Sequence, residues 1–173
     1  MTIEIIPEMA LSPADEAAIA NLLKVCFDTD FGGRSFFIQR HHLRLVMRDG
    51  GRVVGHMALL FRAIRAGGKL VDIIGLAEVA TAPDRRGEGI AGAMLQSAIA
   101  QARASVAKHM MLFGTAGLYA GAGFLPASNV VRHVSTGADQ AQIEQVFGHM
   151  MVMPLQDTPW DHDASVDLRG PKF

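Results

Sequence analysis

ATAPDRRGEGIAGAML, residues Ala80–Leu95, is the segment from which the rest of the chain can be interpreted. An apolar run over Val71–Ala82 leads into it, and apolar residues at helical spacing follow from Ile90 onward. A turn between a strand and a helix presents unpaired backbone N–H groups and the positive end of the helix dipole. Arg85 and Arg86 add fixed positive charge. The segment therefore predicts either an ordinary strand-to-helix turn or a site for a phosphate-bearing ligand.

Composition sets outer limits on fold and function. The chain has 173 residues, enough for one domain with a real core, so we expect a single domain over residues 1–173. Half of the residues are hydrophobic and 19% are charged, which excludes disorder as the main state. The formal net charge of −1 gives no electrostatic case for nucleic acid, and no apolar run is long enough to span a membrane.

Cys26 is the only cysteine, which excludes an internal disulfide and a cysteine-based zinc site. Together with an N-terminus that lacks a signal-peptide pattern, this favours a cytoplasmic protein. His41, His42 and His56 are not spaced as metal ligands, so we expect no metal. Cys26 itself falls on the apolar face of a predicted helix, where it is expected to pack as a small hydrophobic residue.

Hydrophobic periodicity and turn residues predict a mixed set of elements. The first strand is expected at an edge of the sheet, and the next three form an antiparallel meander that ends at the glycine-rich turn. The predicted strands are Thr2–Ile6, His42–Met47, Arg52–Arg65, Lys69–Ala82, His109–Phe113, Asn129–Val134 and His149–Leu155. The predicted helices begin at Ser12 and cover Gly87–Val106, Thr115–Gly123 and, weakly, Asp139–Phe147. His109–Phe113 should run parallel to the preceding long strand, because a helix connects the two.

Three features leave alternatives open. Glu78, in the apolar stretch GLAEVATA, either lies on a solvated face or acts as a general base with a raised pKa. Phe27–Arg40 is either a loop with a short helix packed on the core or a mobile lid whose Asp28 or Asp30 faces a cationic substrate. The tail, residues 156–173, is either disordered or an acidic wall of an acceptor site. Its Trp160, Val166 and Phe173 favour docking.

Two motifs carry a family resemblance. RGEGIA, Arg86–Ala91, fits the pattern Q/R-x-x-G-x-G/A and follows a V-A-x-x-P-x-x-R approach over Val79–Arg86. YAGAGF, Tyr119–Phe124, fits Tyr-x-x-x-Gly-Phe at a suitable distance downstream. With the order of elements, these motifs resemble the GCN5-related N-acetyltransferase (GNAT) superfamily. The resemblance implies an α/β (α+β) GNAT fold, with a central mixed, mostly antiparallel twisted sheet of about seven strands flanked by about four helices.

The resemblance also implies a function, an acyl-CoA-dependent N-acyltransferase in which an amine attacks acetyl-CoA directly in a ternary complex. Glu78 would activate the amine, and Tyr119, unless it is a core tyrosine, would protonate the leaving thiolate. The backbone of the strand end would pair with the pantetheine arm, and the glycine-rich turn would bind the pyrophosphate. The implied acetyl-CoA site comprises Val79, Ala80, Thr81, Arg86, Gly87, Glu88, Gly89, Ile90 and Ala91. A catalytically silent acyl-CoA-binding sensor is the alternative.

A second resemblance concerns the acceptor. The stretch Cys26–Gly68 and the long tail are similar to aminoglycoside 2′-N-acetyltransferases, which makes Asp30, Phe31, Glu78 and Phe173 the substrate-binding candidates. Pro171 departs from that pattern, since an acidic residue is expected there. Nodulation-type N-acyltransferases share the glycine-turn region, so the acyl group need not be acetyl. We expect a small-molecule amine as partner, no nucleic acid and no membrane, and the sequence leaves a homodimer open.

Overall fold

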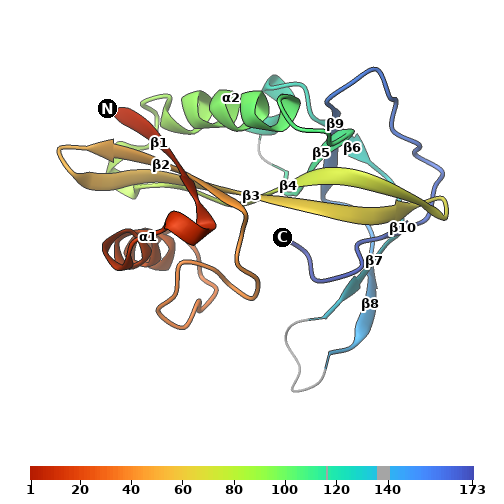
Figure 1. Cartoon of the computed structure of the whole chain (residues 1–173), viewed down its shortest axis with the longest axis horizontal. Coiled ribbons are helices and arrows are strands. Elements are labelled where there is room, and N and C mark those ends of the chain that lie inside the picture. Colours follow the sequence, from red (N-terminus) through yellow and green to blue (C-terminus); the bar gives the residue numbers. More distant parts are fainter. Residues whose placement is uncertain (116, 136–140) are drawn as a thin grey trace. The chain divides into compact units, whose positions relative to one another are not determined.

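The computed structural model describes residues 1–115, 117–135 and 141–173 as a mixed α/β fold (Figure 1). Its elements are β1 (Thr2–Pro7), η1 (Glu8–Ala10), α1 (Pro13–Cys26), β2 (Leu43–Asp49), β3 (Arg52–Ala66), β4 (Lys69–Thr81), η2 (Pro83–Arg85), α2 (Ile90–Arg103), β5 (His109–Phe113), α3 (Gly117–Gly121), β6 (Leu125–Ala127), β7 (Val131–Val134), β8 (Ile143–Val146), β9 (Met150–Pro154) and β10 (Val166–Asp167). The expected class, a mixed and mostly antiparallel sheet with a few helices, is confirmed. In the part of the chain that the structure describes, no helix is long and apolar enough to cross a membrane.

The chain divides into two compact units. The first contains residues 1–60 and 76–100, and the second contains residues 61–75 and 101–173. Strands β3 and β4 each belong partly to both units. The first part of β3 lies in the first unit and the rest in the second, whereas β4 begins in the second unit and ends in the first. The single domain expected from the sequence stays a prediction.

In the first unit, β1 pairs antiparallel with β2, and β2 pairs antiparallel with β3. Among the described strands β1 has no second partner, which confirms it as an edge strand. Ser12 caps α1 by accepting the Asp15 backbone N–H at 3.1 Å, and Pro13 occupies the first helical position. Helices α1 and α2 lie on opposite faces of these strands (Figure 1). Their apolar sides are buried there, as Ile19 and Leu23 of α1 and Leu95 of α2 show.

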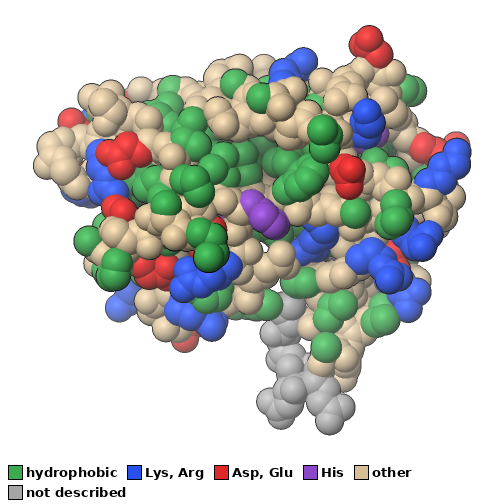
Figure 2. All heavy atoms as spheres, in the orientation of Figure 1, with side chains coloured by type: hydrophobic (Ala, Val, Ile, Leu, Met, Phe, Trp, Pro, Cys, Tyr) green, Lys and Arg blue, Asp and Glu red, His purple; other side chains and the backbone are tan. Residues whose placement is uncertain are grey.

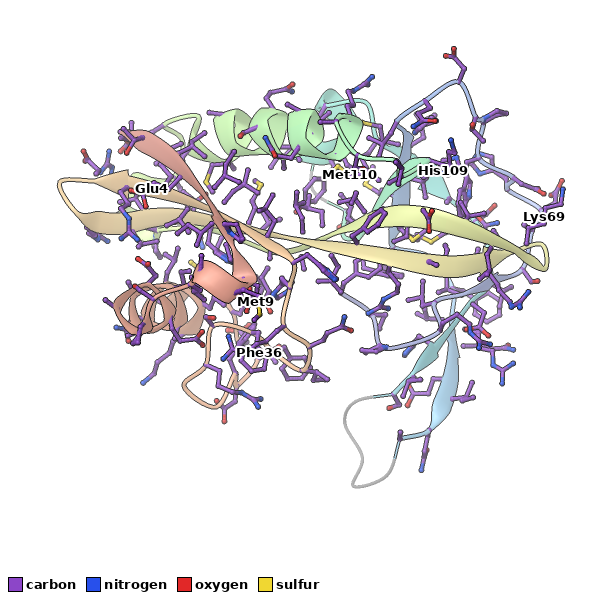
Figure 3. The ribbon with its side chains drawn as sticks, in the orientation of Figure 1. Glu4, Met9, Phe36, Lys69, His109 and Met110 are labelled. Atoms are coloured by element: carbon purple, nitrogen blue, oxygen red, sulfur yellow. The ribbon has the colours of Figure 1, made fainter. Side chains whose placement is uncertain are left out.

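In the second unit the strands follow the order β6-β9-β5-β4-β3-β10-β7-β8. The expected parallel pairing is confirmed, because Ile73 of β4 lies opposite His109 of β5, and Gly75 lies opposite Met111. His109 and Met110 mark β5 in Figure 3. A cluster of apolar side chains forms the core of this unit, with Ile64, Ile73 and Met111 among its fully buried members.

One predicted helix is wrong, and the short helix that one alternative placed in Phe27–Arg40 does not form. Ile143–Val146, in the weak helix expected over 139–147, forms β8 and pairs antiparallel with β7; residues 139 and 140 lie outside the described residues. The free edge of β7 offers backbone partners that a short, mostly exposed segment could not supply as a helix. No helix forms in the described segment 27–42, because Gly32 and Gly33 adopt left-handed backbone angles, with φ of 62° and 72°.

The tail is docked within the second unit, so the disordered alternative is wrong. Val166 and Asp167 form β10, which pairs antiparallel with β3 and parallel with β7. The Trp160 indole N–H donates to the Asn129 side-chain oxygen at 2.7 Å. The indole ring packs edge-on against the His109 ring, with a distance of 5.1 Å between the ring centres. With β6 and β8, the tail strand accounts for the described strands beyond the expected seven, while three α-helices are described rather than about four.

Candidate active site

Glu78 lies in β4 with an unusual backbone conformation. Its φ of 49° is left-handed, which a residue with a side chain adopts only at a cost of about 1–3 kcal/mol. Its side chain is only 9% exposed, so the alternative of a solvated face is excluded. Strain of this kind is retained where the surrounding structure enforces it, and it is concentrated at functional sites.

Three groups of the first unit contact the Glu78 carboxylate. The Phe37 backbone N–H donates to Oε1 at 3.0 Å, and His41 Nε2 lies 3.6 Å from the same oxygen. Arg44 Nη1 lies 3.3 Å from Oε2. Burial raises the pKa of Glu78 to about 7, although Arg44 and the Phe37 amide act to lower it. Near neutral pH this carboxyl group therefore can both take up and release a proton.

Arg44 is fully buried beside Glu78. Its Nε and Nη2 donate to the two carboxylate oxygens of Glu8 at 2.7 and 3.1 Å, a two-bond ion pair. Its Nη1 donates to the Ser35 backbone oxygen at 2.6 Å and lies 3.2 Å from His56 Nε2. A cationic side chain on a central strand is thus satisfied by groups from several elements of the first unit.

The partners of His56 define its protonation. Nδ1 lies 2.9 Å from the Glu78 carbonyl oxygen, which can only accept, so this nitrogen carries the proton. Nε2 faces the Arg44 guanidinium, which can only donate, so it carries a lone pair. His56 is therefore neutral, in agreement with burial lowering its pKa to about 3. Burial and Arg44 likewise lower the pKa of His41 to about 2. Within residues 1–115, 117–135 and 141–173, no group of His, Cys, Asp and Glu is arranged to hold a metal ion.

The glycine-rich turn follows β4 in the first unit. Arg85 is engaged within the protein, since it donates to Glu88 at 2.7 Å and to Asp49 at 2.6 Å. Arg86 is exposed and has no ion-pair partner among the described residues, so only one of the two expected charges is available to a ligand. Gly87 and Gly89 have φ of 86° and 77°, and a Cβ added to either would meet no atom within 4 Å. The turn thus presents its backbone to open space.

The end of β4 has a free edge. Pairing with β5 ends at Gly75 opposite Met111, and no described strand pairs with that edge over residues 76–81. Just after β4, the Ala82 N–H donates to the carbonyl oxygen of Val54 in β3 at 2.9 Å. The backbone of Val79, Ala80 and Thr81 therefore lies where an extended ligand could add as a further strand. The first hydrogen bond of the turn into α2 runs from Ala93 N–H to the Gly89 carbonyl, which leaves the amides before it without intrahelical partners.

Tyr119 belongs to α3 in the second unit. Its half-buried ring packs edge-on against Phe124 with a centroid distance of 6.1 Å, and its backbone carbonyl accepts the Phe124 N–H at 3.0 Å. The hydroxyl has no hydrogen-bond partner among the described residues. Burial raises the pKa of Tyr119, so its hydroxyl is protonated at neutral pH and available as a proton donor.

The acceptor candidates of the first unit do not form an acidic surface. Asp30 is exposed and accepts the Gly32 N–H at 2.7 Å, which shapes its own turn. Phe31 is buried and packs against Phe27 and Phe37, so it supports the segment rather than facing solvent. A pocket of about 300 Å³ exists here, lined by Ala20, Lys24, Phe27, Asp28, Thr29, Asp30, Phe31, Gly33 and Arg34. Both signs of charge line it. Phe36 (Figure 3) is covered by two guanidinium groups of the same segment.

Phe173 lies in the second unit on β4. Its ring would lie 2.7 Å from a Cβ added to Gly75, so only glycine leaves room for it. The centre of the Phe113 ring lies 5.4 Å from the centre of the Phe173 ring, and the guanidinium carbon of Arg62 lies 5.7 Å from it. Arg62 also donates to the Pro171 carbonyl at 2.6 Å, which holds the last residues of the chain in place.

The chain matches the family described as acetyltransferase (GNAT) domain over residues 10–127, which includes Glu78 and both sequence motifs. It belongs to the GNAT acetyltransferase family. The match covers most of the chain and confirms the resemblance to the GNAT superfamily, while the second resemblance, to aminoglycoside 2′-N-acetyltransferases, stays a prediction. No curated protein matches the sequence.

Solved structures of GNAT proteins share the fold of this GNAT protein. A GNAT acetyltransferase from Brucella melitensis, crystallised with acetyl-CoA, is 23% identical, with 95% of each chain covered and a TM-score of 0.61. YhbS from Escherichia coli, crystallised with CoA, is 22% identical over 96% of this chain and 88% of its own, with a TM-score of 0.65. The ribosomal-protein-S18-alanine N-acetyltransferase from Escherichia coli is 16% identical over 91% of this chain and 97% of its own, with a TM-score of 0.62. The predicted donor, acetyl-CoA, agrees with the ligands named for the first two.

Arg44, Glu8 and His56 are the members of the site that sequence reasoning missed. Arg44 is a charged residue in the otherwise apolar run LRLVM, the same kind of signal that singled out Glu78. His56 lies in a similar run, VVGHMALL. Glu8 offered no signal, because an acid after a short first strand is ordinary surface composition.

Proposed function

We propose that this GNAT-family protein is an N-acetyltransferase that transfers acetyl from acetyl-CoA to the primary amine of a small molecule. The observation that carries the proposal is the placement of Glu78. It is a buried carboxyl group on β4, next to the free backbone edge of residues 79–81 and eight residues before the open glycine-rich turn at Arg86. The proposed base and the residues proposed to bind acetyl-CoA thus lie on one continuous segment, residues 78–91.

Features of the described residues fit an acetyl-CoA donor. The pyrophosphate would be held by backbone amides of the turn and by Arg86, which has no ion-pair partner among the described residues. Glu88 would contribute its amide only, because its carboxylate is paired with Arg85. The amides and the charge come from Arg86, Gly87, Glu88, Gly89, Ile90 and Ala91. The pantetheine arm would pair with the backbone of Val79, Ala80 and Thr81 as an added strand.

The donor supplies a thioester carbonyl carbon, to which the amine nitrogen forms a bond while the carbon–sulfur bond breaks. Glu78 takes the proton that the amine must lose to become nucleophilic. Tyr119 gives a proton to the departing sulfur, a role that rests on the sequence motif and on its protonated hydroxyl. The Phe37 amide and Arg44 hold the Glu78 carboxylate in place. Cys26 is not needed as a nucleophile, because the transfer is direct.

A thiol-release assay with acetyl-CoA and a panel of amines tests the proposal. Simple primary amines, polyamines and an aminoglycoside would each be offered, while calorimetry measures acetyl-CoA binding separately. We expect turnover with at least one amine. Tight acetyl-CoA binding without turnover on any amine would instead favour the silent sensor, which needs the turn but neither Glu78 nor Tyr119.

The distribution of charged side chains argues against a polycationic acceptor. On the face shown in Figure 2, Asp and Glu side chains are scattered rather than gathered in one patch. The pocket beside Asp30 also contains Lys24 and Arg34. A polycation such as an aminoglycoside would need a larger excess of acidic groups, so the proposal is limited to a small-molecule primary amine.

Replacing Tyr119 with phenylalanine is expected to lower kcat about 10-fold to 100-fold and to leave acetyl-CoA affinity unchanged. The ring and its packing on Phe124 remain, and only the proton donor is lost. Steady-state kinetics and calorimetry would measure the two effects. A matched Phe124→Tyr variant, which adds a hydroxyl to the partner ring, controls for disturbed packing. Unchanged kcat in Tyr119→Phe would assign the tyrosine to the core alone.

Replacing Phe173 with alanine tests the proposal that the tail walls the acceptor site. We expect the KM for the amine to rise about fivefold or more while acetyl-CoA affinity stays nearly constant, because the ring covers Gly75 of β4. Phe147→Ala, at a phenylalanine that is 67% exposed in the same unit, is the control. Equal losses for both substrates would point to general destabilisation and contradict a wall. A full truncation after Leu155 is less informative, since it also removes β10.

A further inference from the structure

We propose that Arg44 is a positioning residue that orients the Glu78 carboxylate, and that Glu8 controls how much of the Arg44 charge Glu78 experiences. This inference rests on the proposed function, because it treats Glu78 as the base. Arg44 and Glu8 would not touch either substrate. They would act through the geometry and charge of the first unit's interior.

The first support is that Arg44 makes stronger hydrogen bonds to Glu8 than to Glu78. Two of its nitrogens are committed to Glu8 in a fork of 2.7 and 3.1 Å, whereas a single longer contact of 3.3 Å reaches Glu78. A two-bond guanidinium–carboxylate pair is stronger than a single contact. Arg44 is therefore mainly the ion-pair partner of Glu8, and its electrostatic interaction with Glu78 is the weaker of the two.

The second support is that Arg44 is held by neutral acceptors as well. The Ser35 carbonyl and the His56 Nε2 lone pair both accept from Nη1. Because the His56 Nδ1–H binds the Glu78 carbonyl, the same histidine connects Arg44 to the strained backbone of Glu78. A lysine could not replace Arg44 here, since an ammonium group lacks the planar fork.

The third support is the charge around Glu78. The charged and titratable groups that contact Glu78 or act on its pKa are Glu8, Glu16, His41, Arg44 and His56. Both histidines are neutral, and Arg40 is shared between Glu8 and Glu16 at 3.0 Å each. Arg44 is thus the cation that touches Glu78, and it lowers the pKa of Glu78, while Glu8 and Glu16 raise it.

Glu8→Gln and Arg44→Gln should move the site in opposite directions. Glu8→Gln releases the Arg44 charge toward Glu78, so the pKa of Glu78 should fall by about one unit. Arg44→Gln removes that charge, so the pKa should rise by about one unit or more. The pH profile of kcat/KM should shift accordingly, toward acid in the first variant and toward alkali in the second. A merely structural role would move both variants in the same direction.

The control is Glu4→Gln, on β1 (Figure 3), which removes the same charge from the first unit but breaks only the exposed pair with Arg48. It should leave the pH profile unchanged. The pKa of Glu78 is also read directly by carbon-13 NMR titration of its carboxyl group, assigned from the signal that disappears in Glu78→Gln. If the NMR pKa stays constant in Glu8→Gln and in Arg44→Gln, the inference is overturned.

The two readouts separate the inference from the proposed function. If the NMR pKa moves as expected and the rate profile does not, Arg44 and Glu8 tune Glu78, but Glu78 is not the base. Circular dichroism and thermal unfolding verify the fold of each variant. If Glu8→Gln does not fold, the double variant with Arg44→Gln replaces it, since it removes both members of the buried Arg44–Glu8 pair and leaves neither of them unpaired. Its Glu78 pKa should rise, because Arg44 acts on Glu78 more strongly than Glu8 does. An unchanged pKa in the double variant would contradict the inference.

Discussion

Replacing Glu78 with glutamine is expected to lower kcat about 100-fold or more, the usual contribution of a general base. The amide is nearly the same size, and its single oxygen can still accept from the Phe37 N–H, while its NH2 group takes the place of the oxygen that faces Arg44. The acetyl-CoA affinity should be retained, because Glu78 lies outside the glycine-rich turn. In the unchanged protein, kcat/KM should rise with pH through an apparent pKa of about 7, since Glu78 must be deprotonated to accept a proton. This rise should disappear in the variant.

Steady-state rates between pH 5.5 and 9 would measure both effects, at about half-unit steps around the expected midpoint. Glu4→Gln again serves as the matched control, because it makes the same chemical change at an exposed ion pair of the same unit. Turnover in Glu78→Gln within about tenfold of the parent would contradict the assignment of Glu78 as base. A retained pH rise would show that another group controls the profile.

Replacing Gly89 with valine is expected to weaken acetyl-CoA binding by about 2 kcal/mol, or roughly thirtyfold in Kd. At φ of 77° a branched residue is strained, so the turn should distort, and its side chain would enter the open space into which the amides point. Calorimetry with CoA measures the loss directly. The kcat for bound donor should change less than the affinity, because Glu78 lies outside the turn.

Gly51→Val provides the comparison for that experiment. Gly51, in the turn between β2 and β3, has a similar φ of 86° and equally open surroundings, but it has no proposed contact with the donor. Both variants should lose similar thermal stability, and only Gly89→Val should lose CoA affinity. Equal affinity losses in the two variants would mean that the effect arises from strain rather than from a lost binding site.

Much of the fold could be predicted from local signals. Ser12 and Pro13 mark the start of α1, and paired glycines mark the turns of the meander, because capping and left-handed backbone angles depend on neighbouring residues only. The parallel pairing of β4 with β5 followed from a helix between two apolar runs. The turn that is proposed to bind the donor was visible for the same reason, since Arg86, Gly87 and Gly89 lie within six consecutive residues.

The two helices that do not form, one predicted and one left open as an alternative, have different causes. The segment containing Ile143–Val146 has little preference of its own, and the free edge of β7 made it a strand. Phe27–Arg40 showed bulky apolar residues, but their burial depends on packing among Phe27, Phe31 and Phe37 around two left-handed glycines. In the first segment a tertiary partner decided the conformation, and in the second the left-handed glycines excluded the helical alternative.

The candidate site shows where sequence stops and tertiary structure begins. The sequence by itself determined the strand–turn–helix segment that is proposed to bind the donor, and it singled out Glu78, because a charged residue in an apolar strand is costly wherever it is buried. Only the tertiary structure decided that Glu78 is buried, strained and held by Arg44, with Glu8 as the balancing charge. Glu8 and Glu78 lie 70 residues apart in the chain, and no local pattern specifies how strongly two such groups interact. Their coupling depends on distance and burial, which arise only when the chain folds.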